Sequence, residues 1–213
     1  MAARVKICGI SRLEDAELAL SLGAWAIGMI MHADSPRFCA PAAAAEIAEA
    51  FRRKIEVVGV FVNAPLDQVV ARADEIPITI VQLHGDEGPS YCAEVARSTG
   101  LKVIKVARVR NAASVRELAT FTTDFQMLDT YVEGVHGGTG ESFEWELAAS
   151  HSGTPPLILS GGLNSDNVGA AIERVDPFAV DVSSGVEVSP GIKDPSKLRD
   201  FFDAVARATA AAA

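Results

Sequence analysis

A cysteine and an aspartate stand at the ends of two predicted strands, where enzymes of parallel α/β folds keep their chemistry. Cys8 ends the apolar segment 5–8, and Asp129 ends the segment 125–129. Lys6 lies two residues before Cys8, so the two side chains share one face of a strand. A thiol is a base only when ionised, which a neighbouring ammonium group favours. The alternative interpretations are a small core residue for Cys8 and a loop-capping residue for Asp129.

Two glycine-containing segments after the last two predicted strands could bind a phosphate. Gly161 and Gly162 follow the segment 157–160 and precede a predicted helix capped by Asn164 or Ser165. Ser184 and Gly185 repeat this arrangement after the segment 179–182. Glycine allows close approach to the backbone, and free N–H groups at a helix start attract anions. One such turn would be an ordinary connection, but two in adjacent units predict a phosphate site.

Three further polar residues lie near expected strand ends. Arg37 could hold a carboxylate through its planar fork or lie on the surface. His84 could form a hydrogen-bonding wall of a pocket, and Asp181 could bind substrate or only orient loops. His32 and Asp34 raise the idea of a metal site with His84, but further ligands at neighbouring strand ends are lacking, so we expect no metal.

Strand and helix patterns alternate along the whole chain with a period of about 25 residues, the size of one strand–helix unit. The expected strands are 5–8, 26–31, 56–62, 78–82, 103–106, 125–129, 157–160 and 179–182, and the expected helices are 13–21, 41–53, 66–74, 89–97, 112–119, 144–149, 165–174 and 195–207. Several strands are apolar on both faces, as parallel strands covered by helices should be. The pattern predicts an α/β protein, one (β/α)8 TIM barrel over residues 1–213. An open doubly wound sheet is the alternative, but it would normally carry a glycine-rich turn after its first strand, which Gly9 alone does not supply.

Helix starts are predicted from capping residues. Ser11 with Glu14 three positions later forms a capping box pattern. Asn63 and Asp194 each stand shortly before a proline, which suits a cap followed by the first helical turn.

Composition limits the function classes. The chain has 213 residues, 49% hydrophobic, and a net charge of −9. This charge argues against binding to nucleic acid or to an anionic membrane surface. The three cysteines form no CxxC pair, which argues against a disulfide framework and fits a reducing cytoplasm. No signal segment or membrane span is evident. We expect a cytoplasmic enzyme, either monomer or homodimer.

Several motifs occur in an order that resembles the phosphoribosylanthranilate isomerase family of tryptophan biosynthesis. These motifs are KICGI at 6–10, SPR at 35–37, VGVFVN at 58–63, QLHGDE at 82–87, LDT at 128–130, GGTG at 137–140, SGGLN at 160–164, VDVSSGVE at 180–187 and PGIKD at 190–194. Each fragment alone is weak evidence, whereas the ordered set is specific.

The resemblance implies an Amadori rearrangement of N-(5′-phosphoribosyl)anthranilate, with Cys8 as the general base and Asp129 as the general acid. It further implies that Arg37 holds the anthranilate carboxylate and that the phosphate lies at the two glycine-containing loops. No cofactor is required. The alternatives are a histidine-pathway or bifunctional sugar isomerase, in which an aspartate replaces the thiol, a metal-dependent pentose-phosphate epimerase, and a phosphosugar-binding scaffold without activity.

Overall fold

Eight parallel strands pair in chain order, and the eighth pairs with the first, so the sheet closes into a barrel. The computed structural model describes residues 3–109, 111–129, 140–151 and 154–211. The barrel strands are β1 (Arg4–Cys8), β2 (Ala26–Ile30), β3 (Glu56–Phe61), β4 (Ile80–Leu83), β5 (Lys102–Arg108), β6 (Phe125–Asp129), β7 (Leu157–Ser160) and β8 (Ala179–Val182). The predicted (β/α)8 barrel is confirmed.

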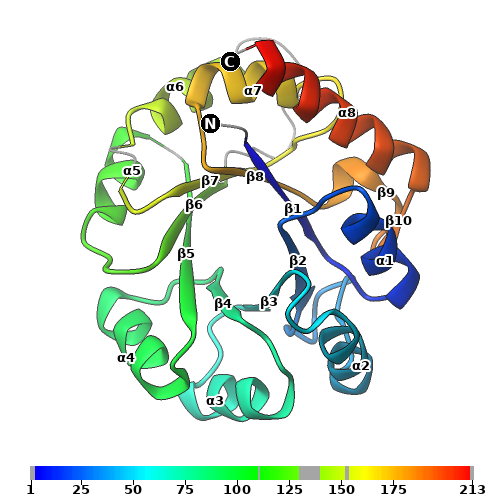
Figure 1. Ribbon diagram of the computed structural model, residues 1–213. Helices are drawn as coiled ribbons and strands as arrows, with labels where there is room; N and C mark the ends of the chain where they lie inside the picture. Colours follow the sequence, from blue (N-terminus) through cyan, green and yellow to red (C-terminus); the bar gives the residue numbers. More distant parts are fainter. Residues whose placement is uncertain (1–2, 110, 130–139, 152–153, 212–213) are drawn as a thin grey trace.

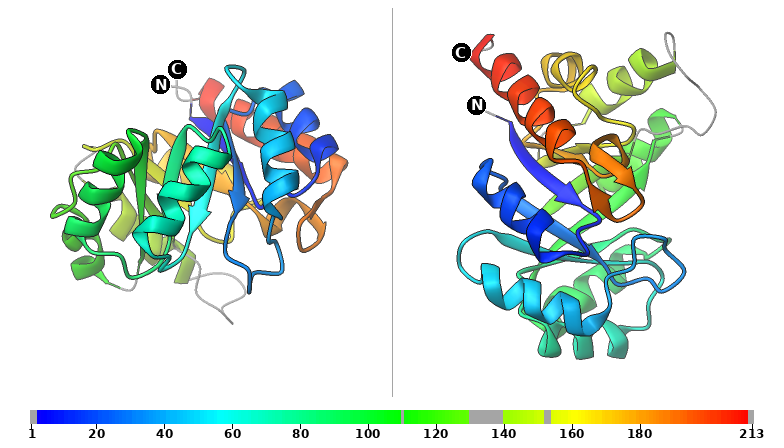
Figure 2. Two further views of the ribbon diagram at one scale, coloured as in Figure 1. Left: turned by 90° about the horizontal axis from the view of Figure 1, so that it is seen from below. Right: turned by 90° about the vertical axis from the view of Figure 1, so that its right-hand side faces the viewer.

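Helices surround this barrel on the outside (Figure 1, Figure 2). They are α1 (Leu13–Ser21), α2 (Pro41–Phe51), α3 (Leu66–Glu75), α4 (Pro89–Thr99), α5 (Ala112–Leu118), α6 (Gly140–Ala149), α7 (Val168–Val175) and α8 (Pro195–Ala211). A short 3-10 helix, η1 (Ser184–Val186), and a hairpin of β9 (Glu187–Ser189) and β10 (Ile192–Lys193) lie between β8 and α8. The predicted strands and helices are found within a few residues of their expected bounds.

Alternate residues of the strands form two separate apolar groups. The group inside the barrel consists of Cys8, Ala26, Val58, Val60, Ile80, Ile104, Val106, Met127, Ile158 and Ala179. The intervening strand residues, such as Ile7 and Leu128, belong to the larger group between strands and helices. Residues two positions beyond the inner group therefore also point inward, and this places Asp129 on the inner side of the barrel rim.

Aromatic rings pack at the amino-terminal ends of the strands. Trp25 precedes β2, Phe125 begins β6 and Phe178 precedes β8, and their ring centroids are 5.3–5.5 Å apart. The Arg4 guanidinium lies 4.7 Å from the centroid of the Phe178 ring, within reach of a cation–π interaction. These side chains close the end of the barrel that is opposite to Cys8 and Asp129.

Of the helix caps predicted at Ser11, Asn63 and Asp194, the first two are wrong. The Ser11 hydroxyl donates to the carbonyl of Gly191 rather than capping α1, so it ties this turn to the β9–β10 hairpin. Asn63 accepts a hydrogen bond from the Asp86 N–H and joins two strand-end loops. Asp194 does cap α8, because its carboxylate accepts from the N–H groups of residues 196 and 197.

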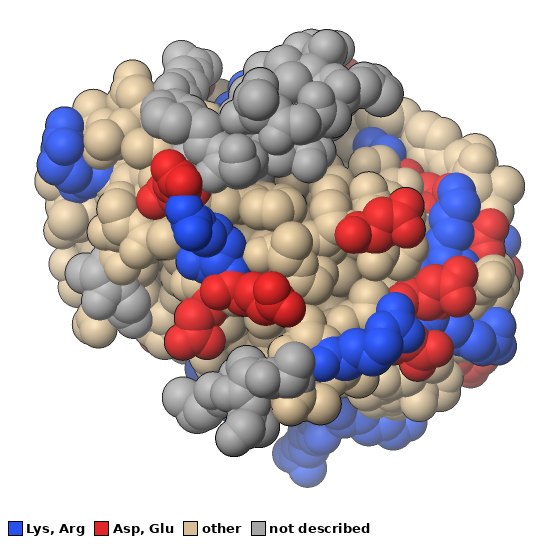
Figure 3. Space-filling view, turned by 90° about the horizontal axis from the view of Figure 1, so that it is seen from above, with Lys and Arg blue, Asp and Glu red and all other residues tan. Residues whose placement is uncertain are grey.

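On the face shown in Figure 3, acidic and basic side chains lie next to one another, and neither sign forms a continuous patch on the part that is described. In the described ranges, no helix has both the length and the apolar character needed to cross a membrane.

Cys39 and Cys92 carry buried thiols outside the barrel interior, and we expect them to make the fold less stable at alkaline pH. Burial raises the pKa of Cys39 to about 11 and, outweighing Lys105, that of Cys92 to about 11. Since the unfolded chain releases these protons near pH 9, it binds fewer protons than the folded chain between pH 9 and 11. The free energy of unfolding should therefore fall by about 2 kcal/mol per thiol across this interval. Urea titrations of the wild type and a Cys39→Ala/Cys92→Ala variant measure this loss, and parallel pH curves for the two proteins would contradict it.

Candidate active site

A buried ion pair lies beside Cys8 inside the barrel. The Lys6 ammonium contacts Asp181 Oδ1 at 2.7 Å, and the Ser160 hydroxyl donates to Asp181 Oδ2 at 3.0 Å. A Cβ built on Gly28 would lie 3.1 Å from both Cys8 Sγ and Lys6 Nζ, so a larger residue there would displace these two groups by a few tenths of an ångström. The predicted common face of Lys6 and Cys8 is confirmed, and Asp181 lies in the same interior.

The protonation of this cluster follows from burial and charge. Burial raises the pKa of the Cys8 thiol above its usual value, although Lys6 and Lys193 act in the opposite direction. Burial would lower the pKa of Lys6, but Asp181 and Cys8 outweigh it and raise that pKa, so the ammonium stays charged. Lys6 thus favours the thiolate as expected, but its effect on the pKa of Cys8 is smaller than that of burial.

Asp129 lies against His84 on the opposite side of the barrel mouth. His84 Nε2 is 3.4 Å from Asp129 Oδ2, and the two side chains are 26% and 21% exposed. The Gln82 amide nitrogen is 3.3 Å from His84 Nδ1, and Gln82 itself is buried. Both His84 and Asp129 therefore face solvent in part and remain accessible to a ligand.

Arg37 is already engaged by a carboxylate of the protein. Its Nε lies 2.9 Å from both oxygens of Glu187, and its Nη2 lies 2.7 Å from Glu187 Oε2. The Lys193 ammonium contacts the same carboxylate at 2.8 Å and donates to the carbonyl of Cys8 at 2.6 Å. Burial opposes the ionisation of Glu187, but its hydrogen bonds with Arg37 and Lys193 outweigh this effect and lower its pKa. This arrangement joins the Arg37 loop to the end of β1.

Glu187 and Lys193 are the site residues that sequence reasoning missed. Their partners are 150 and 185 residues away in the chain, so no local pattern reveals the contacts. The only indication in the sequence was that both residues lie in the segment 180–194, whose motifs resemble those of the isomerase family.

The two glycine-containing loops contact each other. A Cβ on Gly185 would lie 2.0 Å from the Leu163 carbonyl oxygen, so the loop after β8 packs directly on the loop after β7. Gly161 and Gly162 have φ angles of 101° and 63°, which favour glycine. The predicted phosphate residues Gly161, Gly162, Ser184 and Gly185 thus lie in two adjoining loops.

The helix expected directly after Gly161 and Gly162 begins later than predicted. Asn164 forms a turn in which its side chain accepts from the N–H groups of residues 166 and 167, and α7 starts only at Val168. After Ser184 there is one turn of 3-10 helix rather than an α-helix. The expected pair of adjacent helix starts is therefore wrong in this detail.

The described residues place no further metal ligands next to His32 and Asp34, the pair that raised the idea of a metal site. His32 Nε2 and Asp34 Oδ2 are 3.9 Å apart at the surface. Within the described ranges, no three His, Cys, Asp or Glu side chains are grouped as metal ligands. The segment 137–139 of the glycine motif lies outside the described residues.

Removing the cation of the buried ion pair should strongly destabilise the fold. Lys6→Met leaves the Asp181 carboxylate buried without its counter-ion, which typically costs about 3–5 kcal/mol. Urea denaturation followed by circular dichroism measures this loss. A Lys6→Met/Asp181→Leu variant, which removes both charges, should recover a large part of it. A single variant as stable as the wild type would contradict the assigned pairing.

Comparisons with known proteins agree with this architecture. The sequence profile of the family described as N-(5′-phosphoribosyl)anthranilate (PRA) isomerase matches residues 5–204. The N-(5′-phosphoribosyl)anthranilate isomerase of Citrifermentans bemidjiense is 48% identical over 196 residues, which cover 92% of this chain and 93% of that protein. That of Ralstonia nicotianae is 43% identical over 98% of this chain and 94% of its own length.

Solved structures of phosphoribosyl anthranilate isomerases superpose closely on this chain. The phosphoribosyl anthranilate isomerase of Thermotoga maritima has a TM-score of 0.85 at 38% identity, with 96% of this chain and 99% of that chain covered. A related enzyme solved with reduced 1-(o-carboxyphenylamino)-1-deoxyribulose 5-phosphate has a TM-score of 0.82 at 36% identity, covering 96% of this chain and 99% of that one. With the barrel, the loops and these relatives in agreement, the chain belongs to the N-(5′-phosphoribosyl)anthranilate isomerase family, the isomerases of tryptophan biosynthesis.

Proposed function

We propose that this barrel converts N-(5′-phosphoribosyl)anthranilate to 1-(2-carboxyphenylamino)-1-deoxyribulose 5-phosphate with Cys8 as the general base and Asp129 as the general acid. The observation that supports these roles is their placement. The two side chains belong to the inner set of β1 and β6 and lie at the same end of the barrel. Active sites of such barrels lie at that end.

The reaction requires one proton donor and one acceptor. Asp129 donates a proton to the ring oxygen as the C1–O bond breaks, and the lone pair of the anthranilate nitrogen forms a C=N bond to C1. The Cys8 thiolate then removes the proton from C2, and that electron pair forms a C1=C2 bond as the C=N electrons return to nitrogen. Protonation of C1 and loss of the C2 hydroxyl proton give the ketone, so no oxidant or reductant is needed.

Substrate binding would use the remaining predicted residues. The phosphate is assigned to Gly161, Gly162, Ser184 and Gly185. The neighbouring Ser183 hydroxyl supports this assignment, because it is buried without a hydrogen-bond partner in the described structure. Asp181 and His84 would contact the ribose portion from opposite walls. Arg37 would hold the carboxylate through Nη1, because its hydrogen bonds to Glu187 are made by Nε and Nη2.

An activity assay tests this function. Purified protein added to N-(5′-phosphoribosyl)anthranilate should remove the anthranilate-type fluorescence at a rate proportional to enzyme concentration. Binding of the substrate without turnover would instead support a phosphosugar-binding scaffold. The histidine-pathway substrate is a second test, and we expect no turnover because a thiol, not an aspartate, stands at position 8.

Residues 1–213 are proposed to act as a single domain in the cytoplasm. The three cysteines are free thiols, which suits a reducing compartment. The proposed partners are the phosphosugar substrate and, in a homodimer, a second copy of the chain. A Thermotoga maritima relative is described as dimeric, so light scattering on the purified protein should distinguish the monomer from the homodimer.

A further inference from the structure

Arg108 lies on the inner rim of the barrel next to the proposed acid. Ile104 and Val106 of β5 belong to the inner apolar group, so the side chain two positions further on also points inward. Arg108 is the register partner of Asp129 on β6. The N–H of the following residue, Val109, donates to the Asp129 carbonyl at 2.9 Å, which fixes the two strand ends side by side.

The Arg108 guanidinium is exposed, and it has no hydrogen bond or ion pair to any described residue. Several other described cations near this end of the barrel are paired with carboxylates of the protein. These pairs are Lys6 with Asp181, Arg37 with Glu187, Lys105 with Glu87, and Lys193 with Glu187. Arg108 therefore offers an open fork of donors, whereas Arg37 has most of its fork occupied.

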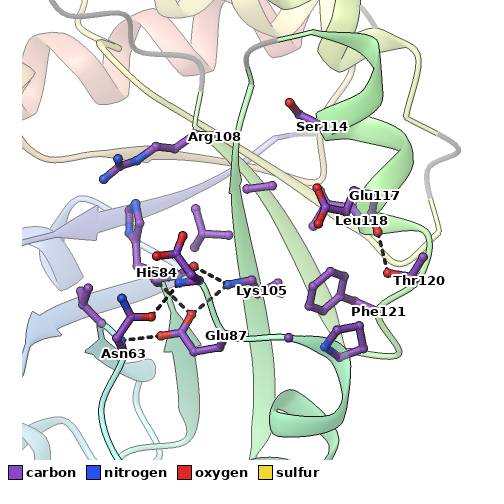
Figure 4. A pocket seen from close by; sticks show the side chains of 17 residues that line it. Asn63, His84, Glu87, Lys105, Arg108, Ser114, Glu117, Leu118, Thr120 and Phe121 are labelled. Atoms are coloured by element: carbon purple, nitrogen blue, oxygen red, sulfur yellow. Dashed lines mark hydrogen bonds and ion pairs between the residues drawn. The ribbon is translucent and has the colours of Figure 1, made fainter.

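A cavity of about 430 Å³ is lined by Arg108 and His84 together with residues of α5. Its Leu118 and Phe121 side chains belong to the apolar group between strands and helices, and Figure 4 shows them across β5 from Arg108 and His84. Because His84 also contacts Asp129, the proposed acid lies on the same side of β5 as Arg108.

The chain order of the barrel sets the direction of the substrate. With the phosphate at the loops after β7 and β8, the opposite side of the closed barrel is formed by β3 and β4, with β5 next to them. The aromatic end of an extended substrate would point to this side. A carboxylate there would meet the Arg108 charge in a protein whose net charge of −9 is otherwise unfavourable to anions.

We propose that Arg108 is a substrate-binding residue that contacts the carboxylate of the anthranilate group, in addition to Arg37. This inference rests on the proposed function and refines its specificity: a substrate without that carboxylate gains nothing from Arg108. A charge-assisted hydrogen bond to this group corresponds to about 10–100-fold in affinity.

Two ligands and matched variants test the proposal. Reduced 1-(o-carboxyphenylamino)-1-deoxyribulose 5-phosphate and its analogue without the carboxylate are titrated calorimetrically into wild type, Arg108→Met and Arg108→Lys. Arg116→Met, at an exposed position on α5, is the control. Arg108→Met should weaken binding of the carboxylated ligand about 10–100-fold, with less than about 3-fold change for the analogue. Arg108→Lys should recover part of the loss, and Arg116→Met should match the wild type.

Kinetics provide an independent readout. If Arg108 binds substrate and transition state equally, Arg108→Met raises KM about 10–100-fold and leaves kcat within about 3-fold. If Arg108→Met binds the carboxylated ligand as tightly as the wild type, or loses equal affinity for both ligands, the role of Arg108 is wrong. The proposed function itself would still stand. A wild-type protein that neither binds the ligand nor turns over the substrate would instead overturn the proposed function.

Discussion

Replacing Cys8 with alanine should lower kcat by about 10²–10⁴-fold, the contribution typical of a general base. The substitution removes one sulfur from a position that is 7% exposed, so the barrel itself should remain folded. Steady-state kinetics and thermal unfolding of the same preparation separate these two effects. Near-normal turnover by Cys8→Ala would remove the thiol from the mechanism.

The pH dependence of the wild type gives this prediction a second signature. Because burial raises the pKa of the Cys8 thiol, only a fraction of the enzyme carries the thiolate at neutral pH. The kcat/KM value should therefore rise with pH until the thiol is ionised, and this rise should be absent in the residual activity of Cys8→Ala. Cys92→Ala is the matched control, since its thiol is also buried but lies on α4 outside the barrel. We expect its turnover to equal that of the wild type.

Asp129→Asn should cause a loss in kcat of similar size, about 10²–10⁴-fold, because an amide cannot supply the proton to the ring oxygen. The amide has nearly the same shape as the carboxylic acid and retains an oxygen to face His84, so KM should change much less than kcat. Single-turnover kinetics on the variant measure the chemical step directly.

The control for this variant is Asp203→Asn, which changes an exposed carboxylate on α8. It should leave kcat unchanged. A kcat for Asp129→Asn within about 3-fold of the wild type would contradict the general-acid role, since a lost acid typically costs at least 10²-fold.

The barrel could be predicted because its determinants are local. Segments such as 57–61, apolar on both faces, alternate with amphipathic helices at a regular spacing, and each pattern lies within one element. The rule that active sites form at the carboxyl ends of the strands then placed Cys8 and Asp129 at a common mouth. The structure contains both at that end.

The details that sequence reasoning did not provide depend on contacts between distant segments. Ser11 has the sequence signature of a helix cap, but it bonds to Gly191, 180 residues away. Arg37 looks like an unoccupied anion-binding residue until Glu187 is placed against it. Arg108 lacks any motif, and only its inward register beside Asp129 reveals it. Local patterns define the elements, whereas these side-chain partners are defined by closure of the barrel.

The aromatic packing of Trp25, Phe125 and Phe178 has a kinetic consequence. With that end filled, ligands enter and leave by one opening, so the reactant cannot pass through the molecule as it is transformed. The ketose product must dissociate before the next aldose substrate binds. Product and substrate therefore compete for the same mouth of the barrel. Accumulated product should therefore act as a competitive inhibitor of the substrate.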